Sequence, residues 1–122
     1  MTELKHKDVT EKIIQCFYEV LNELGCGFLE SVYQNALYLS LREAGFHVEA
    51  QKEINVYFRG QIVGMFKPDL IVNETVIIEI KAIKALNESH ASQLLNYLKA
   101  TEMEIGFLIN YGLEFEFKRF AN

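Results

Sequence analysis

The chain has 122 residues, of which 50% are hydrophobic and 24% are charged, with seven glycines and one proline. This length predicts a single domain over residues 1–122, and the composition disfavours intrinsic disorder, fibrous repeats and a membrane span. The net charge of -5 argues against a protein that holds nucleic acid through bulk positive charge alone.

The N-terminal residues 1–8 alternate between charged and polar side chains and lack the apolar stretch of a secretory signal. We therefore expect a cytoplasmic protein. Cys16 and Cys26 have no CxxC partner, so the sequence suggests neither a zinc site nor a disulfide framework. We expect both cysteines to be reduced and mostly buried.

The first part of the chain predicts two helices joined by a short glycine turn. Apolar side chains recur at helical spacing over residues 9–24, and Gly25 follows where a helix would end. A second helical pattern covers residues 29–41, and Gly45 closes it. Little linker separates the two predicted helices.

The apolar period then changes to two, which is typical of strands. Residues 48–58 predict a first strand, and residues 62–72 predict a second one that is weakened by Gly64 and Pro68. Residues 76–83 predict a third strand, which is rich in isoleucine and therefore expected to be buried on both faces. Together these strands predict an antiparallel meander.

The end of the chain predicts one more helix and two more strands. Asn87 or Ser89 can cap the helix. Its apolar stripe is expected at Ala91, Leu94, Leu95 and Leu98. Strands are expected over residues 105–110 and 114–118. A meander followed by a helix that crosses over to a further strand predicts an α/β fold, with a central sheet flanked by helices.

The third predicted strand carries an acid and a base on one face. Glu79 and Lys81 point the same way because side chains alternate along a strand. If residues 73–75 form a three-residue loop, Asp69 lies directly opposite Glu79 on the same face. A two-residue loop would instead place Asp69 opposite Ile78. The sequence leaves both registers open.

Two carboxylates and an ammonium group in an apolar sheet are costly unless something compensates their charge. A divalent cation would do so, and oxygen ligands suit Mg²⁺ or Mn²⁺. Such a metal lowers the pKa of bound water and neutralises charge on a phosphate, while Lys81 would orient the attacking water or stabilise negative charge. The simpler interpretation is an exposed Glu-x-Lys ion pair of little energetic value.

The helix after the third strand offers further candidates. His90, Gln93 and Tyr97 share one helical face, which could look into the site. Gln93 could bond a ligand carboxylate, a metal-bound water or a phosphate, and Tyr97 could offer its hydroxyl or stack on a base. For His90 we favour a solvated helix face. Gln51 in the first strand is a weaker candidate for a hydrogen bond near the site.

Three motifs carry a resemblance to known families. Pro68-Asp69, nine intervening residues and Glu79-Ile80-Lys81 resemble the signature of the PD-(D/E)XK nuclease superfamily. Residues 27–33 are similar to the Gly-x-x-Glu-x-x-Tyr signature of the bacterial GxxExxY proteins, and residues 93–97 resemble the Gln-x-x-x-Tyr of RecB-like nucleases. The resemblance to GxxExxY proteins covers nearly the whole chain. It implies a restriction-endonuclease-like core with a mixed central sheet.

The resemblance also implies a metal-dependent nuclease that acts on nucleic acid, with DNA the favoured substrate. Glu30, Asp69 and Glu79 would bind Mg²⁺ or Mn²⁺, and Lys81 would be the catalytic lysine. Gln93 and Tyr97 would complete the catalytic set. Glu30 also has a structural interpretation, because acidic residues are favoured in the first turn of a helix.

A second function class stays open, namely a catalytically silent nuclease-fold module that binds nucleic acid or regulates a partner. The acidic net charge and the lack of a basic stripe favour this alternative. Intact Asp69, Glu79 and Lys81 argue against it. A purely structural role has no feature in its favour. We also expect a homo-oligomer or a protein partner, because so small a domain needs help to hold a duplex.

Overall fold

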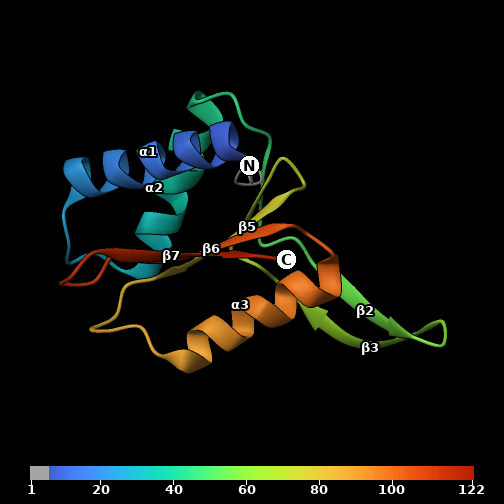
Figure 1. Ribbon diagram of the computed structural model, residues 1–122. Helices are drawn as coiled ribbons and strands as arrows, with labels where there is room; N and C mark the ends of the chain where they lie inside the picture. Colours follow the sequence, from blue (N-terminus) through green and yellow to red (C-terminus); the bar gives the residue numbers. More distant parts are fainter. Residues whose placement is uncertain (1–5) are drawn as a thin grey trace, which may run out of the picture.

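The computed structural model describes residues 6–122 and shows a sheet between two helical layers (Figure 1). Helices α1 and α2 cover one face, α3 covers the other, and the β2–β3 hairpin extends beyond the body. The elements are α1 (Lys7–Leu24), α2 (Glu30–Glu43), β1 (Val48–Ala50), β2 (Ile54–Phe58), β3 (Gln61–Phe66), β4 (Leu70–Val72), β5 (Val76–Lys81), α3 (Glu88–Thr101), β6 (Ile105–Asn110) and β7 (Glu116–Ala121).

The main sheet is mixed and has the strand order β1-β4-β5-β6-β7. Strands β1, β4 and β5 pair antiparallel, whereas β5 and β6 pair parallel and are joined by α3 as the crossover. Strand β7 pairs antiparallel with β6. The predicted fold class, a mixed central sheet with an antiparallel meander flanked by helices, is confirmed.

The two long strands expected over residues 48–58 and 62–72 are each broken into two. Strands β1 and β4 belong to the main sheet, while β2 and β3 form a separate two-stranded sheet. The register of β1–β4 continues into β2–β3 as far as Val56, after which it shifts by one residue, so the two pairs are parts of one interrupted hairpin. The break lies at Gln51, which has a φ of 54°, and at Pro68, which has no N–H to donate. The expectation of two continuous strands was therefore wrong.

Two other strand bounds also differ from prediction. Strand β5 ends at Lys81 rather than at residue 83, and β7 begins at Glu116 rather than at residue 114. The first bound lies where the chain leaves β5 toward α3, and the second lies after the turn from β6 to β7. The side-chain amide of Asn110 joins these two turns, as described below.

The core has two parts, one on each face of the sheet. Ile78 and Ile80 of β5 pack toward α1 and α2, whereas Ile77 packs toward α3. All three isoleucines are fully buried, which confirms that β5 is covered on both faces. Each such side chain contributes about 1.5–3 kcal/mol through removal from water. Because side chains alternate, Glu79 and Lys81 lie on the same side as Ile77, the side of α3.

Helix α3 is capped as predicted but buries a different stripe. The Asn87 side chain accepts a hydrogen bond from the Ser89 N–H, and the His90 ring accepts one from the Asn87 N–H. Tyr97 is 7% exposed and packs inward, whereas Leu95 is 46% exposed. The predicted division into a polar face with Tyr97 and an apolar face with Leu95 was wrong. An aromatic ring with a terminal hydroxyl can be buried and still present a polar tip.

Cys16 is buried in the core, but Cys26 is exposed in the turn before α2, so the expected burial was wrong for Cys26. Both thiols are free, as predicted. Within residues 6–122, every helix is too short or too polar to cross a bilayer.

Candidate active site

Asp69 and Glu79 meet where the β4–β5 hairpin opens. Val72 pairs with Val76, so the turn has three residues, and the register in which Asp69 lies opposite Glu79 is confirmed. The Asp69 N–H donates to Glu79 Oε2 at 2.8 Å, and the Ile80 N–H donates to Asp69 Oδ2 at 2.8 Å. Each carboxylate is therefore held by a backbone donor of the facing strand.

The pair is electrostatically unbalanced. Glu79 is only 5% exposed, and its burial together with the negative charge of Asp69 raises the pKa of Glu79 to about 8. The positive charge of Lys81 acts in the opposite direction. A proton or a cation therefore stabilises this pair, and Lys81 supplies only part of the compensation.

Glu30 comes to this site from the opposite helical layer as the first residue of α2. Burial raises the pKa of Glu30, the positive charge of Lys81 lowers it, and the negative charge of Asp69 raises it again. These influences place Glu30 within electrostatic reach of both residues. The ligand oxygens of Glu30, Asp69 and Glu79 do not all lie within 4.8 Å of one another in the part of the chain that the structure describes.

Tyr33 fixes the turn from which Glu30 emerges. Its hydroxyl donates to the Gly25 carbonyl at 2.6 Å and accepts from the Phe28 N–H at 3.2 Å. Its ring is fully buried and stacks on Tyr111 with 4.7 Å between the ring centroids. The Gly-x-x-Glu-x-x-Tyr segment is thus one structural unit, in which the tyrosine anchors the turn and the glutamate starts the helix.

The structure brings Gln93 and Tyr97 together beside the acidic pair. Gln93 Nε2 donates to the Tyr97 hydroxyl at 3.0 Å. Burial raises the pKa of Tyr97, and the negative charge of Glu79 raises it further, so Tyr97 lies within electrostatic reach of Glu79. His90 caps α3 and lies within electrostatic reach of Glu30.

Two glutamines complete the surroundings of Asp69. Gln51 Nε2 donates to Asp69 Oδ1 at 3.2 Å and to Gln34 Oε1 at 3.1 Å. Gln51 also donates its backbone N–H to the Asp69 carbonyl at 3.1 Å. The sequence indicated Gln51 only weakly and gave Gln34 no role, because their partners depend on the break in the long hairpin.

Asn110 is a further residue that the sequence did not single out. Its buried side chain donates from Nδ2 to the Ile83 carbonyl at 3.0 Å and accepts at Oδ1 from the N–H groups of Ile83 and Gly112 at 3.0 and 3.1 Å. The next N–H, of Tyr111, donates to the Lys81 carbonyl at 2.8 Å. Asn110 therefore fixes the path of the chain just after Lys81.

A surface hollow of about 350 Å³ lies between this turn and the one before α2. Phe28, Lys84 and Gly112 are among its lining residues. Lys84 is exposed there, three residues after Lys81 in the chain. It offers a positive charge at this hollow.

A second group of ligand-type side chains lies at the other end of the β4–β5 hairpin. One ligand atom each from His47, Glu49 and Glu74 lies within 4.8 Å of the others. Glu49 is already paired with Lys52 at 3.1 Å, and this hydrogen bond lowers the pKa of Glu49. The group is exposed or half-buried and separate from Asp69 and Glu79.

Comparison with known proteins gives a family and a fold. Residues 7–120 match the family model described as PD-(D/E)XK nuclease superfamily. A crystal structure of SSO0001 is 20% identical with a TM-score of 0.59, over 76% of this chain and 50% of that one. An alkaline exonuclease, LHK-Exo from Laribacter hongkongensis, is 14% identical with a TM-score of 0.56, over 100% of this chain and 72% of that one.

The chain thus spans half the length of SSO0001, and at these identities the two structures show a shared fold. No curated protein matches the sequence. Because the family model covers nearly all of the chain, this protein belongs to the PD-(D/E)XK nuclease superfamily.

Proposed function

We propose that this protein is a metal-dependent nuclease that hydrolyses phosphodiester bonds of nucleic acid, with DNA as the substrate. One observation carries the proposal. The buried Glu79 and the half-buried Asp69 are each bonded to the backbone of the facing segment at the position of the superfamily motif, and Lys81 follows on the same face. Membership of the superfamily and the likeness to an exonuclease fold support it.

The donor set fits a hard divalent cation. Asp69 and Glu79 offer carboxylate oxygens in a place where burial and the charge of Asp69 penalise the negative charge of Glu79. These two residues would hold Mg²⁺ or Mn²⁺, and Glu30 would complete the site through water, because Mg²⁺ keeps several of its waters. When bound, such an ion supplies a more acidic water and neutralises charge on the phosphate.

The remaining residues would position the reacting groups or stabilise negative charge. Lys81 places a positive charge among the three carboxylates and would stabilise the negative charge that develops on the phosphate or orient the attacking water. The Ile80 N–H and Gln51 keep Asp69 in one orientation. Gln93 and Tyr97 would bond substrate or bound water at the α3 side of the site.

We infer that the chain belongs, within the superfamily, to the GxxExxY proteins. The support is that Gly27, with a φ of 109°, Glu30 and Tyr33 act as one unit that sets the start of α2. The cytoplasmic location, the single domain over residues 1–122 and the homo-oligomer or protein partner stay predictions.

A cleavage assay tests the proposed function. Labelled single-stranded DNA, duplex DNA and RNA are incubated with Mn²⁺, Mg²⁺ or a chelator, using wild type, Asp69→Ala and Lys81→Ala. We expect metal-dependent cleavage that both variants lose, whereas His47→Ala retains it because His47 belongs to the separate group. Equal cleavage rates in wild type, Asp69→Ala and Lys81→Ala would overturn the assignment.

The alternative is a catalytically silent nucleic-acid-binding or regulatory module. The observation in its favour is the pKa of Glu79, because a carboxyl group that keeps its proton near pH 7 relieves the repulsion by Asp69 without a metal. Calorimetry with Mg²⁺ and Mn²⁺ separates the two functions. The calorimetry is best done on the His47→Ala protein, because this variant lacks a ligand of the second group. If that protein takes up no metal, the result would favour the silent module.

A further inference from the structure

The β2–β3 hairpin projects from the body of the protein (Figure 1), and its second strand ends three residues before Asp69. Its base continues the strand pair in which the Gln51 N–H donates to the Asp69 carbonyl at 3.1 Å. On the other strand, the ring of Phe66 packs on Tyr97 with centroids 4.8 Å apart. The hairpin is therefore joined both to Asp69 and to the tyrosine that lies within electrostatic reach of Glu79.

The charge of the hairpin differs from that of the rest of the chain. The protein has 17 acidic residues, yet residues 54–66 contain none and include one arginine, Arg59. Lys52 and Lys67 flank the hairpin and form ion pairs with Glu49 and Glu53. The projecting part is thus weakly positive on an acidic protein.

The hairpin also exposes large apolar side chains. The guanidinium carbon of Arg59 lies 4.9 Å from the centroid of the neighbouring Phe58 ring. Tyr57 and Ile62 lie directly opposite each other on the two strands. The exposed fractions are 61% for Tyr57, 57% for Phe58, 59% for Ile62, 62% for Val63 and 48% for Met65. A cluster of this kind on a projecting element is typical of a binding surface.

We propose that the β2–β3 hairpin binds unpaired bases of a single-stranded nucleic acid that is engaged at the candidate active site. Exposed aromatic rings stack on bases of any sequence, and an arginine adds a cation for the phosphates or a planar group for stacking. The absence of acidic side chains from residues 54–66 removes repulsion from a phosphate backbone. The inference rests on the proposed function in that nucleic acid is the substrate.

Unpaired bases fit this surface better than a duplex groove does. Groove recognition uses side chains that hydrogen-bond to base edges, whereas the exposed side chains here are chiefly apolar or aromatic. The positive charge of Arg59 at the tip of the hairpin favours nucleic acid, rather than an apolar protein surface, as the bound partner.

The length of the hairpin guides the choice of strand for the test. About seven residues separate Gln51 from Phe58, which is roughly 23 Å at 3.3 Å per strand residue. At about 3.4 Å per stacked nucleotide, this distance corresponds to roughly seven nucleotides. A strand of twice that length is therefore long enough to lie at Asp69 and on the hairpin together.

Binding of fluorescein-labelled single-stranded DNA, measured by anisotropy in EDTA, tests the inference without cleavage. For a 15-nucleotide strand we expect Tyr57→Ala and Phe58→Ala each to weaken binding roughly 5- to 150-fold. Arg59→Ala should also weaken it. All three side chains are exposed, so their removal leaves the core intact.

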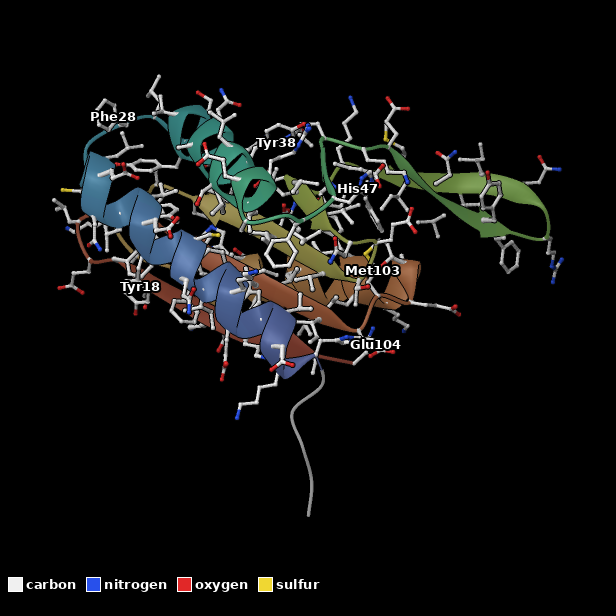
Figure 2. The ribbon with its side chains drawn as sticks, turned by 90° about the horizontal axis from the view of Figure 1, so that it is seen from above. Tyr18, Phe28, Tyr38, His47, Met103 and Glu104 are labelled. Atoms are coloured by element: carbon white, nitrogen blue, oxygen red, sulfur yellow. The ribbon has the colours of Figure 1, made fainter. Side chains whose placement is uncertain are left out.

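Two matched variants serve as controls. Arg42→Ala removes a guanidinium that lies 5.6 Å from the Tyr38 ring centroid, the counterpart of Arg59 on Phe58. Leu39→Ala removes an apolar side chain that is 59% exposed. Both lie on α2, and Figure 2 shows Tyr38 well apart from the hairpin. Neither control should change the affinity for the 15-nucleotide strand.

Unchanged affinity in the hairpin variants would overturn the inference, as would tighter binding of blunt duplex than of single strand. A hairpin variant that converts a wild-type dimer to a monomer would overturn it in favour of self-association. The cleavage rates of wild type and Lys81→Ala are compared in a separate assay. Hairpin-dependent binding without any cleavage would leave this inference standing and contradict the proposed nuclease.

Discussion

The backbone N–H of Asp69 donates to the side chain of Glu79, while the Asp69 side chain accepts from the N–H of the residue after Glu79, both at 2.8 Å. This reciprocal pairing fixes both carboxylates without bringing a positive charge between them. The hydrogen bonds therefore determine where the two carboxylates lie, but the buried negative charge of Glu79 beside Asp69 is poorly compensated.

Glu79→Gln should stabilise the metal-free protein at high pH. The pKa of Glu79 is about 8 in the folded chain against an ordinary value of 4.5, so the folded state holds a proton that the unfolded state has lost. This contribution to stability is fully present below about pH 4.5 and is lost as pH rises through 8. At about 1.4 kcal/mol per pKa unit, the loss amounts to a few kcal/mol.

Thermal unfolding in EDTA at pH 6 and pH 9 measures this effect. Wild type should lose more stability between the two values than Glu79→Gln does. Glu53→Gln is the control, since Glu53 is an exposed partner of Lys67. If Glu79→Gln and wild type lose the same stability, Glu79 is not the group responsible.

Mg²⁺ or Mn²⁺ should raise the unfolding temperature of wild type but not that of Asp69→Ala. An ion that binds only the folded state stabilises it by about 2.7 kcal/mol at a concentration 100 times its Kd. His47→Ala should keep the full metal-induced shift, because the second group lies at the other end of the β4–β5 hairpin. A shift that disappears in His47→Ala and persists in Asp69→Ala would place the metal at the second group instead.

The pairing of Asp69 with Glu79 could be predicted as one of two registers, because it depends on local rules. Strand alternation places Glu79 and Lys81 on one face, and a three-residue turn then determines the facing residue. The break at Gln51 and Pro68 could not be predicted, because the same register continues on both sides of it. Only the packing of each half distinguishes β1–β4 from the projecting β2–β3 hairpin.

Residues that act over long sequence separations were the ones missed. Asn110 bonds Ile83 across 27 residues, which no local pattern indicates. Tyr97 was expected on a polar face, because helical spacing alone does not show that its ring is buried against Phe66 while its hydroxyl bonds Gln93. The helices, the crossover and the strand over residues 105–110 follow from periodicity, and the side-chain network between them does not.

Tyr33→Phe should destabilise the protein and slow cleavage. The substitution keeps the ring that stacks on Tyr111 but removes the hydroxyl that bridges Gly25 and Phe28. Leaving these backbone groups unpaired costs about 1–3 kcal/mol, and the freed turn would misplace Glu30. Urea unfolding and cleavage rates test both effects. Tyr38→Phe is the control, because its hydroxyl accepts only an exposed bond from Arg42, and equal losses in the two variants would contradict the anchoring role.

Gly112→Ala should destabilise the turn that follows Lys81. A Cβ at this position would lie 1.8 Å from the Ile83 carbonyl oxygen. The Ile83 backbone is held there by two hydrogen bonds with the Asn110 side chain, which donates one and accepts the other. Because backbone cannot rotate away as a side chain can, we expect a loss of about 1–3 kcal/mol or more together with slower cleavage.

Gly64→Ala provides the comparison, since the nearest atom to its added Cβ is Val56 Cβ at 3.8 Å. Urea unfolding of both variants, with cleavage rates normalised to folded protein, separates a local displacement from general unfolding. A Gly112→Ala protein as stable and as active as Gly64→Ala would mean that the turn shifts freely. Asn110 would then not determine where Lys81 lies relative to Asp69 and Glu79.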